Sequence, residues 1–198
     1  MFSARRVLLA FGGTALLLAA TVAATHVNSA ATLGSALAGP PWISIEYPAN
    51  PLDATTRGAY LLVHAFHHGT PMQAPVRGTA EGLVNGERKS ISLRFETTSR
   101  PGVYALRKQW GDAGVWTLVI AVVQHEDDLA QALVELAPDG SISSVRVPTR
   151  REREWTIPRR ITSQEIEQSL QLRSAEQKRK ASATTRLSGD ASVGARVN

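Results

Sequence analysis

The stretch that decides the fold is residues 102–123, GVYALRKQWGDAGVWTLVIAVV, where apolar and aromatic side chains alternate on both sides of a glycine-rich centre. Alternation with a period of two predicts β-strands. We therefore expect two strands, joined as a hairpin at residues 111–114. Trp116, Leu118 and Ile120 share one face of the second strand. Because an isolated two-stranded ribbon would leave that face in water, the pattern predicts a hairpin enclosed between packed sheets.

The rest of residues 42–148 repeats this pattern. Further strands are expected at residues 42–47, 59–68, 76–84, 88–97, 129–137 and 141–147. The dipeptides Asn85-Gly86 and Asp139-Gly140 predict tight turns between strands, because Asn, Asp and Gly tolerate positive φ. Residues 129–137 are rich in Ala and Leu and are also compatible with a helix, but their spacing favours a strand. This organisation predicts an all-β fold, an antiparallel immunoglobulin-like β-sandwich of seven or eight strands over residues 39–148.

Several short motifs in this region resemble those of a known family. They are Gly69-Thr70-Pro71 after a strand, Gly78 and Ala80 in the next strand, a G-x-Y motif at residues 102–104 and a G-x-W-x-L motif at residues 114–118. In this order they resemble the YtkA-like and related immunoglobulin-like domains of the bacterial cell envelope. The resemblance covers residues 42–124 and implies that the last two motifs form adjacent strands. It also implies an envelope location, and it carries no catalytic residues.

The first 38 residues have the pattern of an export signal. A short basic segment, residues 1–6, precedes the apolar run at residues 7–24, and Ala36 and Ala38 provide a small-residue cleavage site before Gly39. We therefore expect residues 1–38 to be a signal peptide and the protein to be periplasmic or extracellular. The alternative is an uncleaved inner-membrane anchor through residues 7–24, because a run of this length is near the lower limit for a spanning helix.

Residues 149–198 are expected to form a basic tail. The formal net charge of +5 lies there, because residues 1–148 hold 11 basic and 11 acidic residues whereas the tail holds 11 and 6. Thr162 and Glu165 have capping-box spacing and predict a short helix over about 163–180, followed by disorder. The basic residues of this tail are expected to be solvated, and the alternative is weak contact with anionic lipid or an acidic partner. The balanced charge of the remaining chain argues against a nucleic-acid partner.

Histidines provide the main candidate site. His64, His67 and His68 lie close to Met72 in the sequence, and imidazole with thioether suits copper. Because alternate residues of a strand point to opposite faces, the converging set would be His64, His68 and Met72, with copper or zinc as the ion. The alternative is an exposed polar end of a strand. His125, in the charged loop of residues 124–128, is a candidate for a binding surface.

Trp110 is the second candidate for a binding surface. It precedes the glycine turn beside two polar residues, and we expect it to be the most exposed of the four tryptophans. The other aromatic residues have strand periodicity and are expected in the core.

Motifs that would indicate an enzyme are missing from the sequence. There is no cysteine, no G-x-S-x-G or H-E-x-x-H sequence and no glycine-rich phosphate loop. We therefore expect an exported, non-catalytic immunoglobulin-like module that binds an envelope protein or other ligand and needs no cofactor. One alternative is a periplasmic copper or zinc protein using His64, His67 and His68. Another is a membrane-anchored structural protein with a retained leader.

Overall fold

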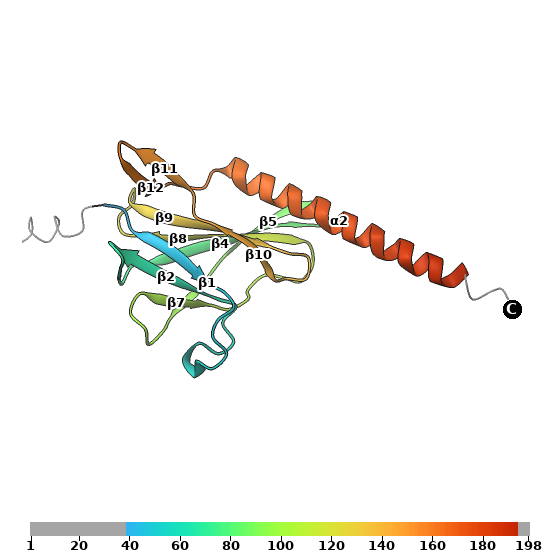
Figure 1. Cartoon of the computed structure of the whole chain (residues 1–198), viewed down its shortest axis with the longest axis horizontal. Coiled ribbons are helices and arrows are strands. Elements are labelled where there is room, and N and C mark those ends of the chain that lie inside the picture. The colour runs from blue at the N-terminus through green and yellow to red at the C-terminus, as the bar shows by residue number, and fades with distance from the viewer. Residues whose placement is uncertain (1–38, 194–198) are drawn as a thin grey trace, which may run out of the picture. The chain divides into compact units, whose positions relative to one another are not determined.

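The computed structural model describes residues 39–193, with side chains up to residue 183 (Figure 1). Within this range the chain consists mainly of antiparallel β-sheet with one long helix, α2 (Ser163–Val193). The all-β class is therefore confirmed. The expected leader, residues 1–38, and residues 194–198 lie outside the described range, so export and cleavage stay predictions. No helix in the described range combines the length and the apolar character needed to cross a membrane.

The strands form two five-stranded sheets and one hairpin. The first sheet, called here the β2 sheet, has the order β1-β2-β7-β6 with the short β3 also paired to β2. The second, the β8 sheet, has the order β10-β9-β8-β4-β5, and β11 pairs with β12 in the separate hairpin. The β2 sheet comprises β1 (Trp42–Glu46), β2 (Leu61–His67), β3 (Thr70–Pro71), β6 (Phe95–Thr97) and β7 (Val103–Leu106). The β8 sheet comprises β4 (Val76–Val84), β5 (Glu87–Ser92), β8 (Val115–Val123), β9 (Leu129–Leu136) and β10 (Ile142–Arg146). The remaining elements are the 3-10 turn η1 (Ala54–Thr56) and the hairpin strands β11 (Thr149–Glu152) and β12 (Trp155–Pro158).

One hydrophobic core joins the two large sheets. The inward residues alternate along each strand, as Leu61 and Val63 do in β2 and Leu118 and Ile120 do in β8. Gly82 in β4 is required by this packing, because a Cβ there would lie 2.6 Å from the ring of Trp116. A glycine inside a strand often marks the close approach of a neighbouring group. At Gly82 that group is the indole of Trp116 in β8.

The predicted hairpin over residues 102–123 is wrong. Its two arms are β7 and β8, which lie in different sheets, and residues 107–114 cross from one sheet to the other. β7 pairs with β2 and β6, whereas β8 pairs with β4 and β9. Each arm is a central strand that needs two neighbours, and the alternating pattern identifies a strand without identifying its partners. The adjacency implied by the family resemblance therefore holds along the chain but not within a sheet.

Trp110 lies in this crossing segment and is buried, with 6% of its surface exposed. Its ring packs edge-to-face on Tyr60, with 5.0 Å between the ring centroids. The prediction that Trp110 is the most exposed tryptophan is therefore wrong. The prediction relied on the polar residues before Trp110, whereas the crossing segment places the Trp110 ring in the core.

The turn predictions are confirmed. Asn85 and Gly86 have φ values of 53° and 85° between β4 and β5, as a type I′ turn requires, and Gly140 has φ 81° between β9 and β10. Residues 129–136 form a strand rather than a helix. The expected strand at residues 88–97 is divided, because β5 belongs to the β8 sheet and β6 to the β2 sheet.

The segment expected to be a tail is more structured than predicted. The hairpin β11–β12 was not foreseen, and α2 continues past residue 180 to Val193. The capping box is confirmed: the Thr162 N–H donates to Glu165 Oε2 at 2.9 Å, and the Glu165 N–H donates to Thr162 Oγ1 at 3.2 Å. The first turns of α2 lie against the outer face of the β8 sheet (Figure 1), where Leu170 is only 1% exposed. Residues beyond 148 therefore form part of the domain.

Candidate binding groove

Helix α2 covers only part of the outer face of the β8 sheet. Under the helix, Ser169 Oγ donates a hydrogen bond of 3.2 Å to Thr117 Oγ1 of β8, and Glu167 lies 3.0 Å from Arg88 of β5. Leu133 of β9 has the same outward parity and is fully buried. Toward the end of β8 at Val123, the face is not covered and forms a groove of about 680 Å³.

The floor of this groove is an apolar strip. Val119, Ala121 and Val123 follow one another on the outer face of β8, and Leu129 of β9 extends the strip. These residues are apolar although they face away from the core, and Val119 and Val123 are the two residues of β8 that are only partly buried. With a rise of about 3.3 Å per residue, the β8 part of the strip is roughly 13 Å long. That length suits an extended chain of about four residues.

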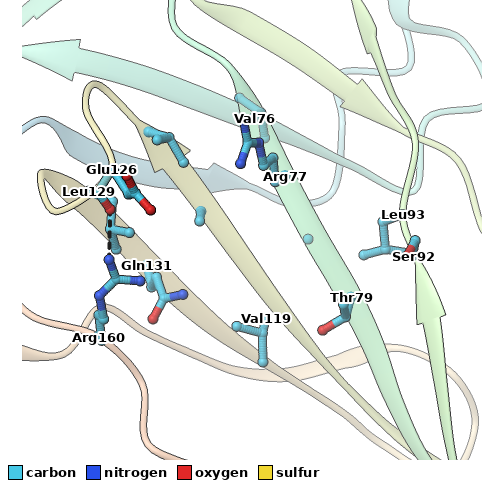
Figure 2. A pocket seen from close by; sticks show the side chains of 13 residues that line it. Val76, Arg77, Thr79, Ser92, Leu93, Val119, Glu126, Leu129, Gln131 and Arg160 are labelled. Atoms are coloured by element: carbon cyan, nitrogen blue, oxygen red, sulfur yellow. Dashed lines mark hydrogen bonds between the residues drawn. The ribbon is translucent and has the colours of Figure 1, made fainter.

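Polar side chains border the strip on both sides (Figure 2). Arg77 and Thr79 project from β4 on one side, whereas Gln131 and Arg160 lie on the other. Arg160 Nη2 donates to the Glu126 carbonyl at 2.7 Å, and the Ile161 N–H donates to Gln131 Oε1 at 2.6 Å. The segment that precedes α2 is therefore attached to the β8–β9 loop and to β9, and it forms a fixed wall of the groove.

The charge of the groove is unequal on its two sides. Arg160 lies 3.5 Å from the Asp127 carboxylate, so its charge is partly balanced. Arg77 is exposed, and within residues 39–183 no carboxylate forms an ion pair with it. An apolar strip with an unpaired guanidinium beside it suits an extended ligand that carries apolar groups and a carboxylate.

His64, one of the predicted metal ligands, lies in β2 and has a carboxylate as its hydrogen-bond partner. Its side chain lies on the outer face of the β2 sheet, with Nε2 2.8 Å from Glu46 Oε2. The imidazole also stacks on Phe66, with the two rings 6.0 Å apart and nearly parallel. Arg100 Nη1 lies 3.6 Å from the same Glu46 carboxylate. His64 thus belongs to a small polar cluster with Glu46 and Arg100.

His67, His68 and Met72 lie at the end of β2. His67 has the inward parity of β2 and is 7% exposed, and no described residue hydrogen-bonds its Nε2. The ring of His68 contacts it edge-to-face at 4.4 Å, and Met72 packs against the core. His64 and His68 therefore have separate neighbours. Within the described residues, no three His, Cys, Asp or Glu side chains are grouped to hold a metal ion, and the copper or zinc site stays a prediction without geometric support.

His125 lies in the exposed loop that the sequence singled out, beside the groove rather than in it. Burial raises the pKa of Asp128 in the same loop, and the nearby imidazoles of His125 and His67 oppose that rise. Trp110, the other predicted binding residue, does not line the groove. Of the groove residues, Arg77, Val119 and Arg160 were not foreseen. The available signal was that β8 is apolar on both faces.

Comparison with known proteins supplies no relative for this chain. No protein-family model, curated protein or solved structure matches it. The functional argument therefore depends on the geometry of the two sheets and of the groove.

Proposed function

We propose that the chain is an exported, non-catalytic immunoglobulin-like binding module of the bacterial cell envelope, whose ligand is an extended acidic segment of polypeptide. The observation that carries the proposal is the apolar strip of β8, left uncovered beside the unpaired cation Arg77. The motifs that resemble YtkA-like envelope domains and the export pattern of residues 1–38 support the location.

The strand order supports the immunoglobulin-like assignment. In that fold the first, second, fifth and fourth strands form one sheet, and the seventh, sixth and third form the other, often with an extra strand beside the third. The order β1-β2-β7-β6 corresponds to the first sheet, and β9-β8-β4-β5 corresponds to the second. In this scheme β7 and β8 are the fifth and sixth strands, which belong to opposite sheets. β3 and β10 are additional strands, so the two sheets together have more strands than the seven or eight expected.

An extended peptide fits the groove better than a compact ligand. The strip is narrow and long, and the polar groups of Thr79, Ser92 and Gln131 along its borders can hydrogen-bond the amides of a peptide backbone. Small apolar side chains would contact Val119 and Ala121. A carboxylate would pair with Arg77, since a guanidinium presents parallel donors to a carboxylate.

The test uses the full chain, purified in a mild detergent because residues 7–24 are apolar. Two fluorescent hexapeptides are compared by anisotropy, one with alternating Ala and Val around a central Asp and one with Lys at that position. We expect the Asp peptide to bind at least about tenfold more tightly, since one charge-assisted hydrogen-bonded pair is worth about 1.5 kcal/mol or more. Arg77→Glu should remove or reverse this preference. Lys89→Glu, an exposed charge reversal on β5 outside the groove, is the matched control.

Equal binding of both peptides, or equal effects of Arg77→Glu and Lys89→Glu, would contradict the proposed site. Mass spectrometry of the recovered peptide tests the non-catalytic role, and any cleaved or modified product argues against it. N-terminal sequencing of the protein isolated from cells tests export. A start at Gly39 agrees with a cleaved leader, whereas retention of residues 7–24 favours the anchored alternative.

A further inference from the structure

The hairpin β11–β12 presents the most exposed aromatic side chain among the described residues. Trp155 has 68% of its surface in solvent. It lies directly after the turn at Arg153, which has φ 55°, and opposite Glu152. Tryptophan combines a large apolar ring with a polar N–H group, and it is enriched where proteins meet the headgroup region of a bilayer.

Arginines surround this tryptophan. Residues 149–160 hold five arginines and two glutamates, an excess of three positive charges. Arg150 pairs with Glu152 at 2.9 Å, and Arg159 pairs with Glu165 at 2.8 Å. Arg151 and Arg153 form no ion pair with any described residue, so their charge is available to an external anion.

The hairpin is attached at the end of the domain where the described chain begins. Arg160, just after β12, donates to the Glu126 carbonyl in the loop between β8 and β9. Asp128 of that loop is within electrostatic reach of His67. At the neighbouring residue, His68, Nε2 would lie 3.7 Å from a Cβ at Gly39. Figure 1 shows the described chain starting at the same end as the hairpin, with α2 extending toward the other end.

The loop between β8 and β9, to which Arg160 attaches the hairpin, lies at one end of the β8 sheet. The opposite end carries the β4–β5 turn and is farthest along the sheet from Val123.

We propose that the hairpin β11–β12 docks this end of the domain on an anionic lipid surface, with Trp155 in the headgroup layer and Arg151 and Arg153 on lipid phosphates. The charge excess and the exposed indole together fit that partner. The inference does not depend on the peptide groove, whose residues Arg77 and Val119 are left unaltered in its test.

The test places one fluorescent label on the hairpin of the full chain. The protein has no cysteine, so Thr156→Cys gives a unique attachment site for a polarity-sensitive dye. Glu87→Cys, at the β4–β5 turn, provides the matched control label. Each labelled chain is reconstituted into nanodiscs of phosphatidylcholine alone or of phosphatidylcholine mixed with the anionic lipid phosphatidylglycerol, whose negative surface potential attracts basic segments. We expect the hairpin dye to shift to the blue and to be quenched by a lipid-phase quencher only with the anionic lipid, and to revert at high salt.

Variants separate the contributions of the side chains. Arg151→Ser with Arg153→Ser should lower the ratio of docked to undocked protein about 30-fold, which corresponds to about 2 kcal/mol for two charges near an anionic surface. Trp155→Ala should lower the ratio severalfold. Circular dichroism verifies that these exposed substitutions leave the domain folded. Equal dye spectra in both lipids, an equal shift of the Glu87→Cys label, or a shift that survives the double arginine substitution would overturn the proposal. So would hairpin binding to a soluble acidic protein in preference to the anionic nanodisc.

Discussion

The two large sheets cover the apolar parts of their outer faces by different means. On the β2 sheet, Leu62, Val103 and Ala105 form a small apolar cluster that Ala49 and Ala59 cover from the preceding loop. On the β8 sheet the cover comes from α2, which is distant in sequence and seals only the region around Thr117 and Leu133. A local loop thus covers the apolar part of one face, whereas a remote helix leaves an apolar part of the other face open. The candidate groove is that open part.

The largest expected loss of stability tests whether the covered parts of the two outer faces are packed equally well. Leu62 and Leu133 are each fully buried on an outer face. Leu62→Ala and Leu133→Ala should each lower the free energy of unfolding by about 3 kcal/mol, since burying less apolar surface and leaving a cavity costs about 2–5 kcal/mol for this change. Urea denaturation measures both. If Leu133→Ala costs less than about 1 kcal/mol, α2 does not seal the β8 sheet, and the comparison fails.

A second substitution tests the helix itself. Leu170→Asp would place an uncompensated carboxylate against the sheet, where the wild-type side chain is 1% exposed. We expect about 2–3 kcal/mol of destabilisation confined to α2. Amide hydrogen exchange should accelerate in residues 163–180 while β8 and β4 keep their protection. Leu172→Asp is the control, because Leu172 is largely exposed and its substitution should change stability by less than about 0.5 kcal/mol.

The difference between local and remote cover also explains what the sequence could predict. Alternation identified β4 and β8 because the period of two is a property of neighbouring residues. It could not identify the partner of β7, since its residue pairs with β2 depend on chain that is about 40 residues away. The start of α2 was predictable because Thr162 and Glu165 bond each other across one turn.

The groove was not predictable for the same reason. Val119 and Val123 are apolar in the sequence, but no local sequence pattern indicates that α2 leaves them uncovered. Arg77 and Arg160 line opposite sides of the strip although they are far apart in the chain, and no motif links them. His64 shows that a contact can be missed for the same reason, because its hydrogen-bond partner Glu46 lies 18 residues away in the sequence.

Glu165 links the helix to the groove wall and gives a pH-dependent test. Hydrogen bonds from the Arg159 guanidinium, and then from the Thr162 N–H, lower the pKa of Glu165 from 4.5 to about 2. A lowered pKa in the folded state stabilises the fold above the ordinary value, and this contribution disappears as the pH falls from 4.5 through 2. Glu165→Gln should therefore lower stability by about 1–2 kcal/mol at pH 7. Denaturation series at pH 7, 4 and 2 should show the difference shrinking toward zero, and a difference that is constant with pH would contradict the assignment.

The smallest effect is expected on the polar part of the β2 sheet. Glu46 bonds His64 at 2.8 Å, but the two side chains keep 30% and 19% of their surface exposed. Glu46→Gln should therefore lower the free energy of unfolding by less than about 1 kcal/mol, since partly exposed pairs are screened by water. For a domain of this size the expected fall in melting temperature is at most about 2–4 °C. A loss as large as that of Leu62→Ala would mean that the polar cluster, and not the apolar loop contact, closes this face. The difference between the outer faces of the β2 and β8 sheets would then depend on charged contacts rather than on apolar packing.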